Sequence, residues 1–181
     1  MNSCLRISLG RYSPFLLMKF NFLPVRSARQ TPLGPMTLAA HDGMLVGAWF
    51  DGQQHQPDMA NWPSDESHPV LLAAAVQLSE YYAGQRHAFD IPLGLNSGTP
   101  FQQSVWRALL NIGSGSTWSY GMISAHLGKP RAVRAVAAAI GRNPISIVVP
   151  CHRVIGSNGA LTGYAGGLNR KATLLQLESP R

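Results

Sequence analysis

The stretch IVVPCHRVIG, from Ile147 to Gly156, joins an apolar β-branched run to a proline and three chemically active side chains. The run at residues 145–150, ISIVVP, predicts a buried extended segment that ends at Pro150. This interpretation places Cys151 at the exit of a rigid strand. Because neighbouring residues of a strand point to opposite faces, a contact between Cys151 and His152 then needs a turn or a bridging water.

Cys151 is one of two cysteines in the chain, and neither it nor Cys4 stands in a CxxC or Cys/His ligand spacing. The sequence therefore predicts a free thiol in a reducing compartment, with no disulfide framework and no metal site. A thiol becomes a nucleophile when nearby positive charge or a base stabilises its thiolate, and His152 and Arg153 follow directly. The alternative is a small buried core residue, the usual setting of a free cysteine.

Charge is spread unevenly along the 181 residues, whose formal net charge is +7. Seven of the eight acidic residues lie between Asp42 and Asp90, and none lies between Ile91 and Leu177. The basic residues of that acid-free region are Arg107, Lys129, Arg131, Arg134, Arg142, Arg153, Arg170 and Lys171. Such segregation is expected where a surface meets a phosphate backbone, and the alternative is a protein that merely has a high isoelectric point.

The first 30 residues hold five basic side chains, no acid and no clear periodicity. We interpret residues 1–30 as a disordered basic arm or an extension upstream of the true start, with a transit-type leader as a third option. No apolar run reaches the ~18 residues of a membrane span, so the sequence predicts a soluble protein without a membrane partner.

Residues 31–95 predict a small α/β subdomain. An Asp42-Gly43 turn between alternating segments predicts a β-hairpin, and residues 53–68 form a polar loop. A helix over 68–84 ends at Gly84, and residues 87–95 return to an extended pattern that is a candidate further strand.

Residues 96–181 predict a mainly helical subdomain. Thr99 is placed as the N-cap and Pro100 as the first residue of a helix. SYGMISAHLGK (119–129) and AVRAVAAAIGRN (132–143) predict two short helices in the layout of a helix-turn-helix. The alanines of the second indicate either tight helix packing or close approach to a groove. A glycine-rich region, 156–167, precedes a final amphipathic helix over 168–178.

Several of these segments together resemble one known family. NPISIVVPCHRVIG, with GYAGG and KATLL..E after it and TPFQQSVW and SYGMIS before it, is similar to the O6-alkylguanine-DNA alkyltransferases, specifically the methylated-DNA–protein-cysteine methyltransferases of bacterial type. The resemblance runs from about residue 31 to Glu178 and is densest from Thr99 onward. It implies a ribonuclease-H-like α/β subdomain with an antiparallel sheet, followed by a helical subdomain that carries a helix-turn-helix.

The resemblance also implies an activity, which is DNA repair by direct damage reversal. A single-turnover suicide enzyme would move the alkyl group of O6-alkylguanine, and of O4-alkylthymine, irreversibly to its own cysteine without a cofactor or metal. The expected partner is double-stranded DNA, bound by a monomer through the minor groove with the damaged base flipped out. The expected location is the cytoplasm, in association with the nucleoid.

Roles follow from the resemblance position by position. Cys151 would accept the alkyl group, His152 would remove the thiol proton through a water, and Glu178 would orient the histidine, as in a catalytic triad. Asn143 would brace the turn between the recognition helix and the acceptor. Tyr120 would hydrogen-bond guanine N3 and help to neutralise the leaving guanine.

Arg134 would enter the duplex and fill the space left by the extruded nucleotide. Tyr164 would line the substrate pocket, the backbone of Val154 would contact the exocyclic amine, and the amide of Ala165 would face O6. The other residues that the resemblance places at the DNA or the pocket are Arg131, Ala135, Arg142, Thr117, Ser119 and Gly166. Gly113 departs from the family pattern, in which a proline usually stands there, and this glycine is expected to loosen its turn.

Two other functions compete with this assignment. The first is a helix-turn-helix protein that senses lesions without chemistry, as alkyltransferase-like proteins do, but those carry another residue in place of Cys151. The second is a cysteine hydrolase that uses Cys151 and His152, which would have to turn over more than one equivalent of substrate.

Overall fold

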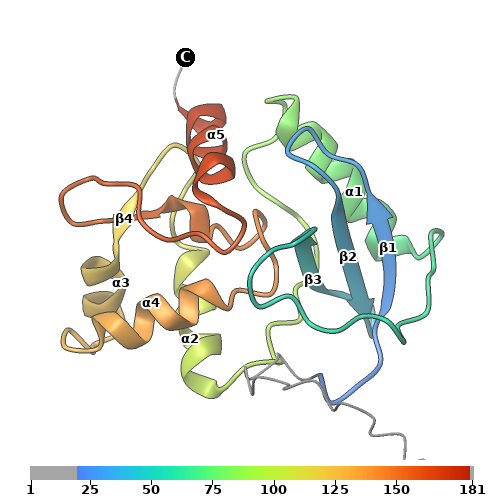
Figure 1. Ribbon diagram of the computed structural model, residues 1–181, viewed down its shortest axis with the longest axis horizontal. Helices are drawn as coiled ribbons and strands as arrows, with labels where there is room; N and C mark the ends of the chain where they lie inside the picture. Colours follow the sequence, from blue (N-terminus) through green and yellow to red (C-terminus); the bar gives the residue numbers. More distant parts are fainter. Residues whose placement is uncertain (1–19, 180–181) are drawn as a thin grey trace, which may run out of the picture.

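The computed structural model describes residues 20–179 (Figure 1). The elements in chain order are β1 (Val25–Arg29), β2 (Met36–His41), β3 (Met44–Phe50), α1 (Pro69–Tyr82), α2 (Pro100–Leu109), β4 (Trp118–Ser119), α3 (Tyr120–His126), α4 (Val133–Gly141), the 3-10 turn η1 (Cys151–Arg153), β5 (Val154–Ile155) and α5 (Leu168–Glu178). The sheet and α1 form one lobe and the remaining helices form the other, as the fold class predicted from sequence requires.

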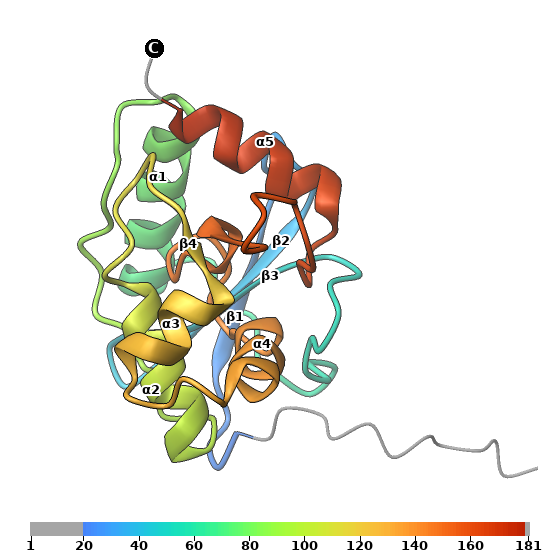
Figure 2. The same ribbon diagram turned by 90° about the vertical axis from the view of Figure 1, so that its left-hand side faces the viewer.

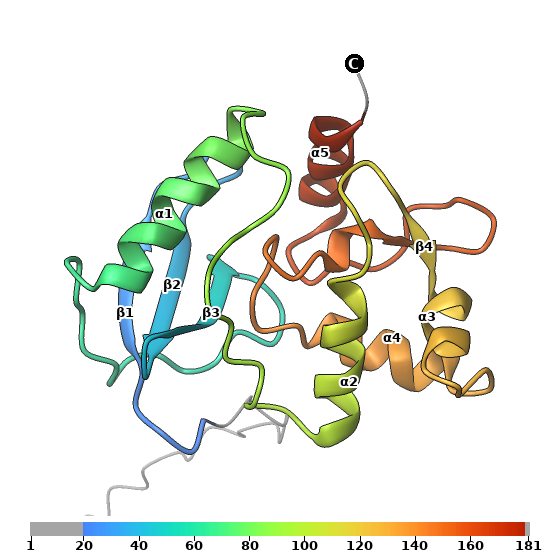
Figure 3. The same cartoon turned by 180° about the vertical axis from the view of Figure 1, so that it is seen from behind.

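The N-terminal lobe is built on an antiparallel sheet in the order β1-β2-β3. The predicted hairpin is confirmed, because β2 and β3 pair and Asp42 and Gly43 both adopt positive φ angles, 47° and 70°, between them. Helix α1 covers one face of the sheet (Figure 3). Its residues Leu71 and Leu78 are buried in the hydrophobic core there. Gly84, at φ 71°, follows the end of α1 as predicted.

The interpretation of residues 1–30 as an extension is wrong from residue 20 onward. Val25–Arg29 form strand β1, although their sequence shows no apolar alternation, and loop residues pair with its two arginines. Arg26 donates to the carbonyl of Trp62 at 3.2 Å, and Arg29 forms an ion pair with Glu66. Residues 1–19, on which the leader and basic-arm alternatives depend, lie outside the described residues.

The outer face of the sheet is covered by aromatic side chains rather than by a helix. Trp49 of β3 packs against Trp62, with ring centroids 6.0 Å apart, and Phe20 lies edge-on to both rings. The segment that precedes β1 therefore belongs to the folded lobe.

The candidate strand at 87–95 forms only one bridge. Leu45 of β3 donates to the carbonyl of Pro92 and accepts from Gly94, and the pairing goes no further. Pro92 lacks an amide hydrogen and so cannot extend the ladder. The segment lies beside β3 as irregular extended chain.

The C-terminal lobe confirms the predicted helices. Helix α2 starts with a capping box between Thr99 and Gln102, and Pro100 is its first residue. Helices α3 and α4 form the helix-turn-helix, with Gly128 at φ 67° in the turn, and they lie next to α2 (Figure 2). Ala139 of α4 serves close packing, because Trp106 of α2 donates to its carbonyl at 2.9 Å, whereas Ala135 and Ala138 are exposed.

The prediction of an extended strand at 145–150 is wrong, whereas its burial is confirmed. The segment turns sharply, with Ile147 at φ 73°, and every residue from Asn143 to Val154 is buried. It docks on β3, where Ala48 donates to the carbonyl of Pro144 at 2.9 Å and accepts from Ser146 at 2.8 Å. Cys151 consequently opens the 3-10 turn η1 instead of leaving a strand.

In the described part of the chain no helix is long and apolar enough to cross a membrane.

Two glycine substitutions test this packing. A Cβ on Gly47 would lie 1.9 Å from the ring of Trp49, so Gly47→Ala should lower the free energy of unfolding by about 1–3 kcal/mol. Gly113 has no atom within 4 Å of an added Cβ and has no positive φ, so Gly113→Ala should be neutral or stabilising by about 0.4–1 kcal/mol. Urea unfolding of both variants is the measurement, and equal effects would contradict the packing argument.

Candidate active site

Cys151 lines a pocket of about 170 Å³ between the two lobes. Its lining consists of Gln54, Tyr120, Ala137, Ile140, Gly141, Cys151, Gly163, Tyr164 and Ala165. Four residues predicted from the sequence therefore meet here, namely Cys151, Tyr120, Tyr164 and Ala165. Sequence reasoning missed Gln54 and the wall of α4, because both reach the pocket through tertiary packing.

Two predicted pocket residues lie elsewhere. The side chain of Val154 is buried and its carbonyl accepts from Lys171 at 2.5 Å. Gly166 is packed so closely that a Cβ there would lie 2.8 Å from the ring of Tyr164. Neither residue is among the pocket lining, and Gly166 packs against the ring of Tyr164, which is part of that lining.

The hydroxyl of Tyr120 stands at the pocket wall. It donates to the carbonyl of Thr162 at 3.1 Å, and an added Cβ on Gly163 would lie 3.5 Å from it. The first residue of α3 is thus held against the 162–165 loop, which supplies the opposite wall.

Asn143 ties Cys151 to the turn before it. Its Nδ2 lies 2.8 Å from the carbonyl of Val149, 3.3 Å from that of Ile145 and 3.1 Å from Sγ of Cys151. Its Oδ1 accepts from the amide of Ile145 at 3.1 Å. One side chain therefore takes the place of the ladder hydrogen bonds that a strand would have supplied.

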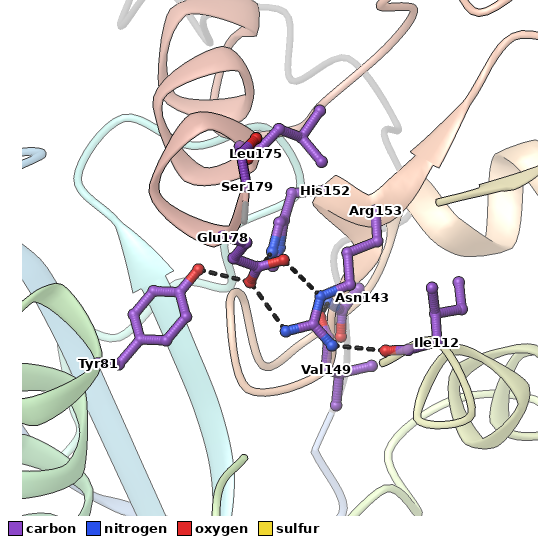
Figure 4. A network of polar contacts seen from close by, with 9 residues as sticks. All are labelled: Tyr81, Ile112, Asn143, Val149, His152, Arg153, Leu175, Glu178 and Ser179. Atoms are coloured by element: carbon purple, nitrogen blue, oxygen red, sulfur yellow. Dashed lines mark hydrogen bonds and ion pairs between the residues drawn. The ribbon is translucent and has the colours of Figure 1, made fainter. Parts of the chain in front are cut away.

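Glu178 and the two residues after Cys151 form a buried ionic network (Figure 4). Nε2 of His152 lies 2.9 Å from Oε1 of Glu178. The guanidinium of Arg153 donates to the same carboxylate twice, from Nε to Oε2 and from Nη2 to Oε1, both at 2.8 Å. Its Nη1 donates to the carbonyl of Ile112. The side chains of His152 and Glu178 are 0% and 1% exposed, so water does not weaken the pair.

The protonation states follow from these contacts. Burial opposes the ionisation of Glu178, but hydrogen bonds from His152 and Arg153 outweigh it and hold the pKa of the carboxyl well below its usual range. Since the carboxylate only accepts, Nε2 of His152 carries a hydrogen and Nδ1 is the basic nitrogen. Nδ1 is buried and has no hydrogen-bond partner among the described residues.

Burial dominates the pKa values of Cys151 and His152. It raises the pKa of the Cys151 thiol, which the Asn143 hydrogen bond and the charge of Lys171 only partly offset. Burial likewise lowers the pKa of His152 against the pull of Glu178. Cysteine and histidine are therefore both neutral at rest, rather than a thiolate–imidazolium ion pair.

Lys171 is a fully buried lysine that sequence reasoning missed as a site residue. Its ammonium donates to the carbonyls of Val154, Thr162 and Gly163 at 2.5, 2.6 and 3.1 Å, which fastens the pocket loop to β5. Burial lowers the pKa of Lys171 to about 8, so it still carries most of its charge at neutral pH.

The basic residues predicted to meet DNA lie on and beside α4. Arg131, Arg134 and Ala135 are exposed, as is Lys129 in the turn before them. Among the described residues no carboxylate pairs with Arg131 or Arg134. Their charge is therefore available to an external partner, next to the α4 residues that line the pocket.

The other predicted DNA contacts have different surroundings. Thr117 is exposed, whereas Ser119 caps α3 by accepting from the amide of Met122 at 3.1 Å. Arg142 is half-buried and donates to the carbonyl of Ala138 at 3.1 Å.

In the described range no group of three or more His, Cys, Asp or Glu side chains gathers that could hold a metal ion.

Removal of the Glu178 charge should be costly for the fold. Glu178→Gln leaves the buried guanidinium of Arg153 without its counter-charge, and we expect a loss of about 3–5 kcal/mol in the free energy of unfolding. The matched control is Glu80→Gln, which removes the partner of Arg86 in an ion pair that is open to solvent and should cost no more than about 1 kcal/mol.

Comparison of Glu178→Gln with the wild type also tests how stability depends on pH. Because folding lowers the pKa of Glu178, its stabilisation is complete above the ordinary value of 4.5 and is lost as pH falls toward the folded pKa. The difference in the free energy of unfolding between wild type and Glu178→Gln, measured by urea titration, should therefore become smaller as the pH falls. A difference that stays constant would contradict the assignment.

Comparison with known proteins places the chain in a family. Residues 25–95 match the model for the ribonuclease-like domain of 6-O-methylguanine DNA methyltransferase, and residues 100–180 match the model for its DNA binding domain. A methylated-DNA–protein-cysteine methyltransferase of Mycobacterium tuberculosis is 50% identical over 152 residues, which cover 83% of this chain and 90% of that protein. The constitutive enzyme of Bacillus subtilis is 44% identical over 156 residues, covering 82% and 92%.

A solved structure agrees with these matches. The crystal structure of Mycobacterium tuberculosis OGT in complex with DNA superposes with a TM-score of 0.80 at 47% identity, and the match covers 85% of this chain and 92% of that one. Both lobes and the buried cysteine site thus fall within the matched region. The chain belongs to the 6-O-methylguanine DNA methyltransferase family.

Proposed function

We propose that this protein repairs alkylated DNA by transferring the alkyl group from O6 of guanine, and from O4 of thymine, to Sγ of Cys151. The observation that carries the proposal is the placement of that sulfur. It lines a pocket whose wall includes residues of α4, next to the exposed Arg131 and Arg134, and the next residue, His152, is paired with Glu178. Family membership supports the same reaction, and the methylated-DNA–protein-cysteine methyltransferases are similar over most of their length.

The chemistry uses the groups already described. Sγ of Cys151 attacks the alkyl carbon, a carbon–sulfur bond forms, and the carbon–oxygen bond breaks with its electron pair on the guanine. The thiol proton passes through a water to Nδ1 of His152, since Nε2 is committed to Glu178. The hydroxyl of Tyr120 would exchange its present acceptor, the carbonyl of Thr162, for N3 of the departing guanine, and its donated hydrogen would stabilise the charge that develops there.

The reaction happens once in each molecule. A thioether is a poor leaving group, and nothing in the proposed sequence regenerates the thiol. Asn143 keeps the sulfur fixed at 3.1 Å during the approach, while the neutral resting state of Cys151 protects it from unwanted electrophiles. The protein is then a stoichiometric reagent more than a turnover catalyst.

The partner in this proposal is double-stranded DNA, bound by a monomer through the minor groove. The alkylated oxygen is inaccessible inside stacked base pairs, so the nucleotide has to be flipped into the pocket, at a cost of roughly a few kcal/mol. Arg134 stands on the exposed face of α4 and would fill the gap, while Arg131 and Lys129 would contact phosphates. The lesion-sensing alternative without chemistry is not favoured, because Cys151 occupies the acceptor position.

Transfer to Cys151 is tested by mass spectrometry of the protein after mixing with a duplex that holds one O6-methylguanine. We expect one added methyl group per protein, located on the peptide that contains Cys151, and none in Cys151→Ala. Cys4→Ala is the matched control and should accept one methyl group as the wild type does. Tight binding of the duplex without modification would refute the transfer and favour lesion sensing.

Arg134→Ala tests base flipping. Loss of the side chain should slow transfer from the duplex by roughly 100-fold, since flipping costs a few kcal/mol, but leave the reaction with free O6-methylguanine base unchanged. Arg131→Ala also removes one positive charge, but it should only weaken DNA binding. The slope of log affinity against log salt concentration should fall by about one. Equal losses on duplex and free base would contradict the role given to Arg134.

A further inference from the structure

Tyr81 connects the N-terminal lobe to the reaction centre. It lies on α1, is 2% exposed, and donates from its hydroxyl to Oε1 of Glu178 at 2.7 Å (Figure 4). That oxygen is the one that accepts from Nε2 of His152, and it also accepts from Nη2 of Arg153. Three donors from two lobes therefore share a single carboxylate oxygen.

The sharing has a physical consequence. A carboxylate oxygen offers a limited amount of electron density, so each donor weakens the bonds made by the others. The Tyr81 hydroxyl keeps its proton, because burial and the negative charge of Glu178 both raise its pKa. Tyr81 is thus a neutral donor that competes with His152 for Oε1 without adding charge to the site.

We propose that Tyr81 is a positioning residue for the alkyl transfer, which fixes Oε1 of Glu178 and so sets the orientation of His152 and how strongly it binds a proton. The inference rests on the proposed function and adds to it that the N-terminal lobe takes part in the reaction. Hydrophobic packing alone does not require the hydroxyl, since a phenylalanine would fill the same space beside Phe89 and Tyr82.

Three of the other groups that face His152 are charged, and the Cys151 thiol that precedes it in the chain is neutral at rest. Glu178 favours the protonated ring, while Arg153 of η1 and Lys171 of α5 oppose it. Removal of any of these three would change the charge of the site. Tyr81→Phe deletes one hydrogen bond and leaves every charge in place, which makes it the discriminating variant.

The experiment compares the full-length wild type with Tyr81→Phe and with a matched control, Tyr82→Phe. The control removes the hydroxyl of the next residue of α1, which does not bond Glu178. Two rates are followed against pH: methyl transfer from an O6-methylguanine duplex, and labelling of Cys151 by iodoacetamide, read on its peptide by mass spectrometry. The second reaction needs neither DNA nor base flipping.

In Tyr81→Phe, Oε1 binds His152 more strongly and stabilises its protonated form. The acid limb of both profiles should therefore move to higher pH by roughly half to one unit, with transfer on that limb slowed roughly 3- to 10-fold. The affinity for the duplex should not change, and Tyr82→Phe should follow the wild type.

Two results would overturn the inference. One is a Tyr81→Phe profile that superimposes on that of the wild type, and the other is an equal slowing of both variants at every pH, which is the signature of packing. If the wild type transfers no methyl group, the proposed function fails, and the iodoacetamide profile alone then decides the role of Tyr81.

A second replacement covers the case in which Tyr81→Phe does not fold. Monofluorotyrosine at position 81 keeps the shape and donates more strongly, because its hydroxyl is more acidic. It should draw Oε1 away from His152 and move the acid limb to lower pH. A shift in the opposite direction, or no shift, would refute the positioning role.

Discussion

The carboxylate of Glu178 is the constraint on which the rest of this molecule depends. It neutralises Arg153, which would otherwise be a buried charge, and it holds His152 by Nε2, which leaves Nδ1 as the base. A buried ion pair is costly to form and more costly to break. Here that cost is offset by close geometry and by the hydroxyl of Tyr81, so the fold and the chemistry rely on the same four side chains.

Cys151 is positioned by a turn rather than by a strand, and that turn also joins the lobes. Asn143 satisfies the backbone of 145–149 from within, which frees Pro144 and Ser146 to bond Ala48 at the side of β3. Gln53 extends the junction, because its Oε1 accepts from the hydroxyl of Ser146 at 2.9 Å. The N-terminal lobe, through β3 and Gln53, is therefore a scaffold for the segment that leads to Cys151.

Turn and helix-cap residues predicted the parts of the fold that depend only on neighbours in the sequence. The Asp42-Gly43 turn and the Thr99-Pro100 helix start carry their reasons within four residues of sequence, and the structure confirms both. The segment 145–150 was predicted as a strand because its composition is that of a buried strand, but side-chain hydrogen bonds of Asn143 override propensity there. The parts played by Arg153 and Lys171 depend on partners that only folding brings near, so spacing could not reveal them.

The order of these parts along the chain governs when the site can form during synthesis. Cys151 and His152 leave the ribosome before Glu178, which lies 26 residues after the histidine at the end of α5. Until α5 docks, the histidine lacks its carboxylate and the pocket loop lacks the ammonium of Lys171. One helix thus supplies both the carboxylate that holds His152 and the ammonium that holds the pocket loop, so the docking of α5 completes the site.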